Sequence, residues 1–126
     1  MIVRAKTDVP CVEWGNGQSY RLLVQRDNMG FSVAHTVVRA GTKSPLRYLR
    51  HFEACYCIAG HGEVVTVDGT THPVRPGVLY ALDQHDPHFL IAAPDTDLEL
   101  ISVFNPPLHG DERHNLGDDS EEFSHY

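Results

Sequence analysis

The stretch from residue 51 to residue 90 decides the fold. It reads HFEACYCIAGHGE (51–63), VDGTTHPVRPG (67–77) and VLYALDQHDPHFL (78–90). Short runs of β-branched and aromatic residues alternate here with glycine and proline turns, a pattern typical of antiparallel strands. Asp68-Gly69 is the strongest hairpin signal in the chain, because this dipeptide suits the left-handed conformations of a tight hairpin turn. The stretch therefore predicts several short strands joined by tight turns.

The same pattern continues on both sides of this stretch. The segment 31–41 alternates, with Phe31, Val33, His35 and Val37 on one face and Ser32, Ala34, Thr36 and Val38 on the other. Further strands are expected in YRLLVQ (20–25), HFLIAA (88–93) and LELISVF (98–104). Short strands at such regular spacing, with turn residues between them, predict an all-β sandwich or barrel.

The β region is expected to end at Asn105-Pro106-Pro107, and the chain after it has a different composition. The tail from 108 to 126 holds six of the 17 acidic residues and few apolar ones. We therefore expect one domain, with a barrel over about 1–107 and a C-terminal tail over about 108–126. The tail is expected either to be solvated and partly disordered or to form a short helical or irregular lid around 110–117.

Composition excludes several classes of function. The chain has 126 residues and a formal net charge of −7, without any cluster of lysine and arginine, so nucleic acid is not an expected partner. No apolar run approaches the roughly 18 residues that a membrane span needs, and no secretory signal is evident. Three cysteines are too few and too awkwardly spaced for a disulfide framework. We therefore expect a cytoplasmic protein with reduced thiols.

The central stretch resembles the two metal-binding motifs of cupins, which implies a single cupin domain, a small β-barrel or jelly roll. In the second motif, Tyr80 stands three residues after Gly77, in the region of the last metal-binding histidine. The first cupin motif consists of a glycine, two histidines, a glutamate and a second glycine at fixed spacing. The residues at these positions here are Gly41, Arg47, Leu49, Glu53 and Gly60. The glycines and the glutamate match, and Arg47 and Leu49 replace the two histidines.

A metal site can still be assembled from what remains. Glu53, Tyr80 and one of the histidines His85 and His88 would supply a carboxylate, a phenolate and an imidazole, a set that suits Fe(II), Mn(II) or Zn(II). Three protein ligands leave positions open for substrate, which is the catalytic arrangement. In the alternative interpretation, Glu53 caps a turn, Tyr80 packs in the core, and both histidines lie in a loop.

Several longer motifs in the chain are similar to those of ectoine synthases, which are small bacterial cupin cyclases. These motifs are GFSVAHTVVRAGT (30–42), HFEACYCIAGHGE (51–63), RPGVLYALDQHDPHFL (75–90) and VFNPPLHGDERH (103–114). The resemblance covers about residues 14 to 117. It implies a hydro-lyase that closes N-γ-acetyl-L-2,4-diaminobutyrate into ectoine with loss of water. It also implies an Fe(II) site on Glu53, Tyr80 and His88, with Zn or Mn as possible substitutes.

The resemblance further implies which side chains meet the substrate, an N-acetylated diamino acid. The positions that it places around the substrate are Trp14, Arg21, Thr36, Tyr48, Phe104, Glu112 and His114. Three of them, Tyr48, Glu112 and His114, are candidates to carry protons in catalysis. Arg21 suits the carboxylate of the substrate through a two-point contact. The resemblance also implies a homodimer.

Some residues depart from the usual pattern of the family and keep alternatives open. A cupin relative acting on a related N-acyl diamino acid or an amino-acid amide is one alternative. A small cupin iron dioxygenase or isomerase and a non-catalytic ligand-binding cupin are the others. The departures that motivate the first alternative, a related substrate, are Tyr20, Arg47, Ala59, His61 and Ser102.

Overall fold

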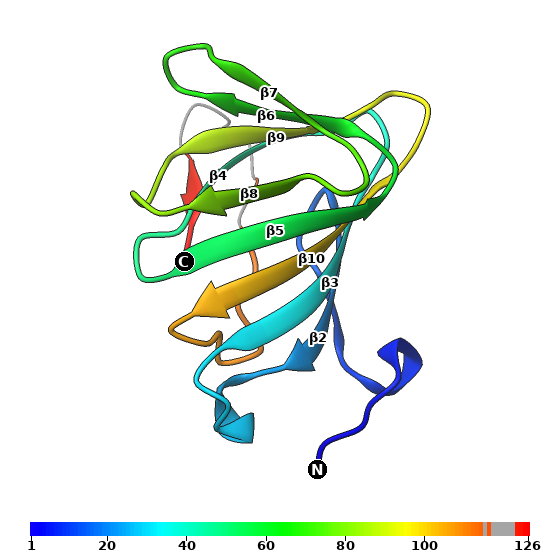
Figure 1. The fold of residues 1–126 in the computed structure, drawn as a ribbon, viewed down its shortest axis with the longest axis vertical. Coiled ribbons are helices and arrows are strands. Elements are labelled where there is room, and N and C mark those ends of the chain that lie inside the picture. Colours follow the sequence, from blue (N-terminus) through cyan, green and yellow to red (C-terminus); the bar gives the residue numbers. More distant parts are fainter. Residues whose placement is uncertain (115, 117–122) are drawn as a thin grey trace.

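Two β-sheets packed face to face make up the protein, which we describe from a computed structural model (Figure 1). The structure describes residues 1–114, 116 and 123–126. The larger sheet has the spatial order β1 (Cys11–Glu13), β2 (Gly17–Leu23), β3 (Ser32–Val38), β10 (Leu98–Asn105), β5 (Phe52–Ala59) and β8 (Leu79–Leu82). The smaller sheet has the order β11 (Ser124–His125), β4 (Lys43–Arg47), β9 (His88–Ala92), β6 (Gly62–Thr66) and β7 (Thr71–Val74).

The prediction of an all-β protein is confirmed. The alternating segment 31–41 contains β3, and the turn at Asp68-Gly69 joins β6 to β7 in an antiparallel pair. Two short 3-10 turns, η1 (Lys6–Asp8) and η2 (Gln25–Asp27), are the helical elements among the described residues. No helix in this part of the chain is long and apolar enough to span a membrane.

Three details differ from the expectations. The strand expected at 20–25 runs from Gly17 to Leu23, because its pairing with β3 begins at Gly17↔Val38. A short strand, β1, precedes it and was not predicted. The described residues 111–114 and 116 of the tail are irregular rather than helical, which is one of the forms expected. Ser124 and His125, for which no strand was expected, form β11, which pairs with β4 as the one parallel strand pair of the described sheets.

Strand β5 shows which face of the large sheet is buried. Glu53, Cys55 and Cys57 point into the space between the sheets, as the period of two requires. Phe52, Tyr56 and Ile58 alternate with them, face outward and are 42–49% exposed. Only one face of β5 is therefore buried, because only one face of this sheet is covered.

The core between the sheets consists of two neighbouring clusters. The larger cluster contains aliphatic residues of both sheets together with Cys55 and Cys57, and all three cysteines of the chain are free thiols. The smaller cluster is aromatic and receives residues from the tail; it consists of Tyr48, Leu82, Phe104 and Leu108, with Tyr80 and Tyr126 packed against it. Polar side chains gather next to this second cluster.

Candidate active site

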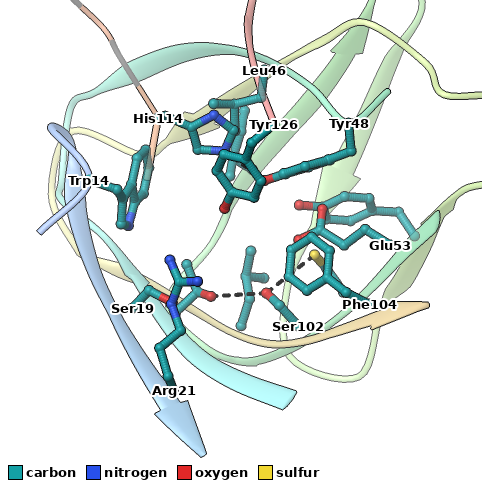
Figure 2. A pocket seen from close by; sticks show the side chains of 15 residues that line it. Trp14, Ser19, Arg21, Leu46, Tyr48, Glu53, Ser102, Phe104, His114 and Tyr126 are labelled. Atoms are coloured by element: carbon teal, nitrogen blue, oxygen red, sulfur yellow. Dashed lines mark hydrogen bonds between the residues drawn. The ribbon is translucent and has the colours of Figure 1, made fainter. Parts of the chain in front are cut away.

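A cavity opens between the two sheets beside the aromatic cluster (Figure 2). Its wall includes eight of the residues expected in the site: Trp14, Arg21, Thr36, Tyr48, Glu53, Tyr80, Phe104 and His114. In Figure 2, Tyr48, Tyr126 and His114 lie on one side of the cavity, and Arg21, Ser19 and Ser102 lie across from them. The remaining expected residues, Glu112 and His88, lie next to it rather than in its wall.

Alternation along the strands explains why these side chains meet. Ser19 and Arg21 are two residues apart on β2, and Glu53 and Cys55 are two residues apart on β5. Each pair therefore points to the same face of its strand. Tyr80 comes from β8, where it stands directly opposite Cys55 in the antiparallel pairing. A carboxylate, a thiol and a phenol thus meet on adjacent strands.

Glu53 is a carboxyl group in an unfavourable environment for its charge. It is 6% exposed. Burial raises its pKa to about 8, although a hydrogen bond with Cys55 acts in the opposite direction. Burial also raises the pKa of the Tyr80 hydroxyl well above its ordinary value, and Cys55 and Glu53 raise it further. Both groups would be stabilised as anions by a cation placed between them.

His88 presents an imidazole nitrogen in the form that binds metals. Its Nδ1–H donates to the backbone carbonyl of Asp86 at 2.9 Å, and a carbonyl oxygen can only accept, so Nδ1 carries the proton. Burial lowers the pKa of His88, so the ring is neutral. Its Nε2 lone pair is buried and has no hydrogen-bond partner within the described part of the chain. This is the ligand state of a metal-binding histidine.

Tyr80 is the expected metal ligand that shares a hollow with each of the other two. The rings of Tyr80 and His88 lie 6.4 Å apart between centroids, and these two side chains line a second hollow between β8 and the hairpin β6–β7. Tyr80 and Glu53 line the main cavity. Among residues 1–114, 116 and 123–126, no three His, Cys, Asp or Glu side chains form a metal-binding group, so a site here needs the Tyr80 phenolate.

Arg21 is a buried cation with unused hydrogen-bond donors. It is 4% exposed, and its Nη2 donates to the backbone carbonyl of Glu112 at 2.5 Å. Its Nη1 lies 4.0 Å from Glu112 Oε1. Within the described residues, Nε and Nη1 have no hydrogen-bond partner, although both are buried. Buried donors of this kind are costly unless a ligand accepts from them, and a carboxylate matches their planar geometry.

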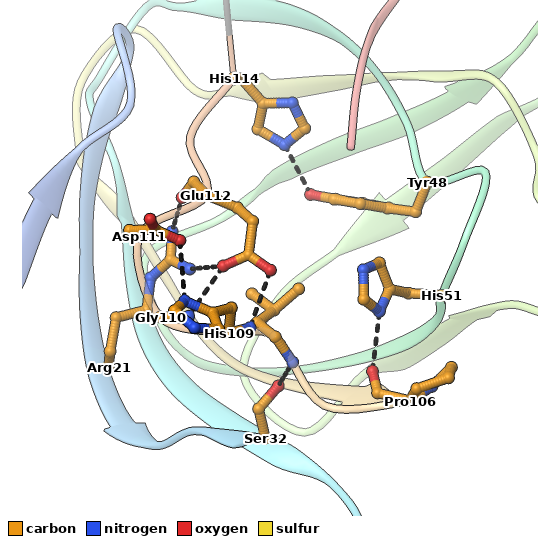
Figure 3. A network of polar contacts seen from close by, with 11 residues as sticks. Arg21, Ser32, Tyr48, His51, Pro106, His109, Gly110, Asp111, Glu112 and His114 are labelled. Atoms are coloured by element: carbon orange, nitrogen blue, oxygen red, sulfur yellow. Dashed lines mark hydrogen bonds and ion pairs between the residues drawn. The ribbon is translucent and has the colours of Figure 1, made fainter. Parts of the chain in front are cut away.

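Glu112 is engaged with the backbone of the tail rather than facing the cavity (Figure 3). Its carboxylate accepts N–H groups of His109 and Gly110, each at 2.8 Å. Burial alone would raise the pKa of Glu112, but these backbone hydrogen bonds and the Arg21 charge lower it overall. Glu112 is thus held as a carboxylate beside Arg21, a placement that suits orientation of the guanidinium better than proton transfer.

Tyr48 and His114 form a hydrogen-bonded pair at the cavity wall (Figure 3). The Tyr48 hydroxyl lies 2.9 Å from His114 Nε2, and both side chains are buried. Burial raises the pKa of Tyr48 well above its ordinary value, with Glu53 as the next contributor. A neutral phenol hydrogen-bonded to an imidazole provides a path for a proton.

The floor of the cavity carries a short polar chain. Thr36 Oγ1 lies 2.9 Å from Ser102 Oγ, which lies 3.5 Å from Cys55 Sγ. Ser19 and Cys55 were not among the expected site residues, although their spacing of two from Arg21 and Glu53 could have indicated them. The other unforeseen wall residues are Leu46, Leu90, Leu100 and Tyr126.

Known proteins resemble this chain over most of its length. The family model described as ectoine synthase matches residues 1–120. The L-ectoine synthase of Halalkalibacterium halodurans is 48% identical over 104 residues, which are 82% of this chain and 79% of the relative. The L-ectoine synthase of Desulfatibacillum aliphaticivorans is 50% identical over 103 residues, covering 81% of this chain and 78% of the relative.

Solved structures agree with this assignment. The crystal structure of ectoine synthase from P. lautus superposes with a TM-score of 0.82 at 41% identity, covering 87% of this chain and 81% of that one. A sugar phosphate isomerase described as a cupin-superfamily protein has a TM-score of 0.59 at 24% identity, covering 71% of this chain and 59% of that one. That second likeness shows the fold alone. The chain therefore belongs to the ectoine synthase family, a family of hydro-lyases, and has the cupin fold.

Proposed function

We propose that this protein closes N-γ-acetyl-L-2,4-diaminobutyrate into the cyclic amidine ectoine with release of water. The observation that carries the proposal is one cavity that combines the buried Arg21 guanidinium with Glu53, Tyr80 and the Tyr48–His114 pair. Such a cavity offers a receptor for a carboxylate at one side and groups for carbonyl and proton chemistry at the other. The names of the relatives, L-ectoine synthase, support this substrate.

Arg21 would bind the carboxylate of the substrate. Its Nε and Nη1 have no hydrogen-bond partner among the described residues, and either of them, together with the second N–H of Nη2, can donate to the two oxygens of a carboxylate, while the first N–H of Nη2 stays on the Glu112 carbonyl. Trp14 and Phe104, both buried in the cavity wall, would exclude water from the bound chain. Holding the flexible substrate in this space brings its amine and its amide carbonyl together, which lowers the entropic part of the barrier.

Glu53, Tyr80 and His88 fit an Fe(II) ion, and Zn(II) or Mn(II) would suit the same donors. The fit follows from the unpartnered Nε2 of His88 and from the burial that raises the pKa of Glu53 and Tyr80 in the absence of a cation. When bound there, the ion would supply Lewis acidity toward the amide oxygen of the substrate.

The Tyr48–His114 pair would handle the protons. Ring closure forms a bond between the amine nitrogen and the amide carbon. The former carbonyl oxygen leaves as water after it gains two protons, both of which the two nitrogens of the new ring lose. The attacking nitrogen must lose a proton, which Tyr48 can take at its hydroxyl while passing its own proton to His114 Nε2. Glu112 would keep Arg21 in place rather than take part in proton transfer.

The protein is proposed to act in the cytoplasm, since its three cysteines are free thiols, as a reducing compartment favours. It is further proposed to act as a homodimer, an idea supported by the apolar residues left exposed on β5 and β8.

A turnover assay tests the proposed reaction. Purified protein is stripped of metal, reloaded anaerobically with Fe(II) and given the acetylated diamine, and ectoine is measured by chromatography. We expect ectoine to form, and Arg21→Lys to raise KM by about 10-fold, because a lysine cannot replace the two-point contact. Arg26→Lys, at an exposed arginine of η2, is the matched control.

Three results would contradict the proposal. Turnover of a longer N-acyl diamine or an amino-acid amide in place of the acetylated substrate would indicate a related cyclase. Oxygen consumption coupled to turnover would indicate an iron dioxygenase. Ligand binding by metal-free protein without any turnover would indicate a binding protein.

A further inference from the structure

The last residues of the chain enter the active site. Strand β11 runs parallel to β4, with Ser124 opposite Leu46 and His125 opposite Arg47. The next residue, Tyr126, lines the cavity. These residues lie beyond the match of the family model, which ends at residue 120. The site of this chain therefore contains side chains that its family membership does not assign.

Ser124 contacts the ring nitrogen of His114 that faces away from Tyr48. Its Oγ lies 3.0 Å from His114 Nδ1, and the Tyr48 hydroxyl lies 2.9 Å from Nε2 of the same ring. Both His114 and Ser124 are 7% exposed. The imidazole is thus held at both nitrogens, by the tail on one side and by the residue that follows β4 on the other.

Tyr126 supports the same ring from its face. Its centroid lies 4.4 Å from that of His114 with an interplanar angle of 32°, and 5.2 Å from that of Tyr48 in an edge contact at 67°. Contacts of this kind restrict rotation of the imidazole about its side-chain torsions. Ser124 and Tyr126, two residues apart, therefore act on His114 together.

We propose that Ser124 is a positioning residue, which accepts the Nδ1–H of His114 and leaves Nε2 as the acceptor of the Tyr48 proton. The hydrogen bond that one imidazole nitrogen makes decides which nitrogen carries the proton. The Tyr48 hydroxyl, 2.9 Å from Nε2, can then donate to this nitrogen. The inference rests on the proposed function in one respect, namely that the Tyr48–His114 pair moves the protons of ring closure.

The proton balance of the step is simple. The substrate amine gives one proton to the Tyr48 oxygen, and the phenolic proton moves to His114 Nε2. The ring is then protonated on both nitrogens, and its Nδ1–H remains on Ser124 Oγ. The proton on Nε2 later returns through Tyr48 to the departing oxygen, and the second proton of the released water comes from an N–H that the two nitrogens of the new amidine ring lose when the C=N bond forms. With the opposite tautomer, Nε2 would already carry a proton and could not accept this one.

The tautomer can be measured directly by long-range 1H–15N NMR on protein loaded with diamagnetic Zn(II), with the signals assigned by comparison with His114→Gln. We expect a protonated Nδ1 and an unprotonated Nε2 in the wild type, and a shift toward the other tautomer in Ser124→Ala. An Nε2-protonated ring in the wild type, or the same tautomer in Ser124→Ala, overturns the inference.

Kinetics of the iron-loaded enzyme give the second readout. Ser124→Ala is expected to lower kcat about 10-fold with little change in KM, since the pair acts in proton transfer rather than in binding. Ser124→Thr, which keeps the hydroxyl, should restore most of kcat. Ser44→Ala is the matched control, because Ser44 is a buried β4 serine whose Oγ accepts from Asn16 at 2.8 Å, away from the cavity wall.

The two readouts separate this inference from the proposed reaction. Equal loss of kcat in Ser124→Ala and Ser44→Ala would reduce Ser124 to a structural role and overturn the inference, whatever the substrate. A wild type that shows the expected tautomer but makes no ectoine would support the placement of His114 and contradict the proposed function.

Discussion

His88 is the side chain whose chemistry its surroundings define most narrowly. The Asp86 carbonyl fixes the proton on Nδ1, burial keeps the ring neutral, and Nε2 is left as a buried lone pair. A purely structural histidine would satisfy both nitrogens. The alternative interpretation of a loop histidine therefore fits poorly with this environment, and a metal ligand fits well.

The first prediction concerns iron. Glu53→Ala and His88→Ala should each weaken Fe(II) binding by about 100-fold or more, because a three-ligand site loses one of its donors and the remaining two cannot hold the ion. Iron content after gel filtration, measured by mass spectrometry together with circular dichroism to verify folding, checks this. His61→Ala, at an exposed histidine in the turn between β5 and β6, should bind iron like the wild type.

Folded variants that keep wild-type iron content would show that these residues are not the ligands. Tyr80→Phe sharpens the test, because it removes only the phenolic oxygen and leaves the packing against the aromatic cluster.

The second prediction concerns the pH dependence of the metal-free protein. Burial raises the pKa of Glu53 from 4.5 to about 8. Below pH 4.5 the Glu53 carboxyl is protonated in the folded and in the unfolded protein, so it does not make the free energy of unfolding depend on pH. Between about 4.5 and about 8 the unfolded chain releases this proton and the folded protein retains it, so stability falls as the pH rises, by up to a few kcal/mol.

Urea unfolding of metal-free protein across this pH range measures the slope. Glu53→Gln should remove most of it, since glutamine has no proton to release, and Glu63→Gln, at an exposed glutamate of β6, should leave it intact. An unchanged slope in Glu53→Gln would assign the dependence to another group.

Part of the site could be predicted from the sequence and part could not. Spacing alone placed Glu53 and Tyr80 in a cupin-like metal motif, and the cavity contains both. Spacing alone could not choose between His85 and His88, because the choice depends on the free Nε2 that only the fold reveals. It also could not show that the Glu112 carboxylate turns to the backbone N–H groups of His109 and Gly110.

Strand β2 delivers Arg21 and Ser19 to the cavity, and its position depends on a close approach at its first residue. A Cβ on Gly17 would lie 1.8 Å from the Val37 carbonyl oxygen, which belongs to the neighbouring strand. No side chain fits there, so glycine permits the pairing of β2 with β3.

The third prediction follows from this contact. Gly17→Ala should destabilise the protein by about 2 kcal/mol or more, because backbone on both strands must move. It should also raise KM, since the displacement moves Arg21. Chemical denaturation and steady-state kinetics measure the two effects. Gln18→Ala, the next residue of the strand, is the control and should change neither by much. Wild-type stability in Gly17→Ala would mean that the strand pair tolerates the shift.

The tail is the second element that the site depends on. Residues 108–114 carry Leu108 into the aromatic cluster, Glu112 to Arg21 and His114 to Tyr48. The prediction of a lid over 110–117 stays a prediction where it falls on residues 115 and 117, which lie outside the described residues, as do 118–122 of the expected disordered tail.

The fourth prediction is that deletion of residues 111–126 lowers kcat by at least about 100-fold, because it removes His114 together with Glu112. The unfolding midpoint should change much less, since the strands from β1 to β10 end at Asn105. Steady-state kinetics measure the loss of kcat, and thermal unfolding measures the change in the midpoint. Unchanged kinetics in the truncated protein would make the tail dispensable for the reaction.

The strands themselves were predictable to unequal degrees. β3, β10 and the hairpin β6–β7 were foreseen, because five or more alternating residues or an Asp-Gly turn mark them. β1 and β11 have three and two residues, too few for any periodic signal, and they exist through pairing with β2 and β4. Short edge strands of this kind depend on their partners rather than on their own residues.

The outward face of the large sheet remains the least explained surface of the protein. Phe52, Tyr56 and Ile58 of β5 and Leu79 of β8 are 42–58% exposed, and Tyr56 pairs directly with Leu79. Apolar side chains that are contiguous and exposed on a sheet face are typical of an interaction surface. β8 is also an edge strand of its sheet, with one side free of a partner among the described strands.

The fifth prediction is that a second copy of the chain covers this face. A homodimer would bury these four side chains, and a charge placed among them would have to be buried without a partner. Tyr56→Lys and Leu79→Lys should therefore convert the protein to a monomer, as measured by light scattering coupled to gel filtration at micromolar concentration. Val67→Lys, at an equally exposed apolar residue in the β6–β7 turn, should leave the dimer intact. A wild type that is monomeric at that concentration, or a dimer that survives both substitutions, would show that a second copy of the chain does not cover this face.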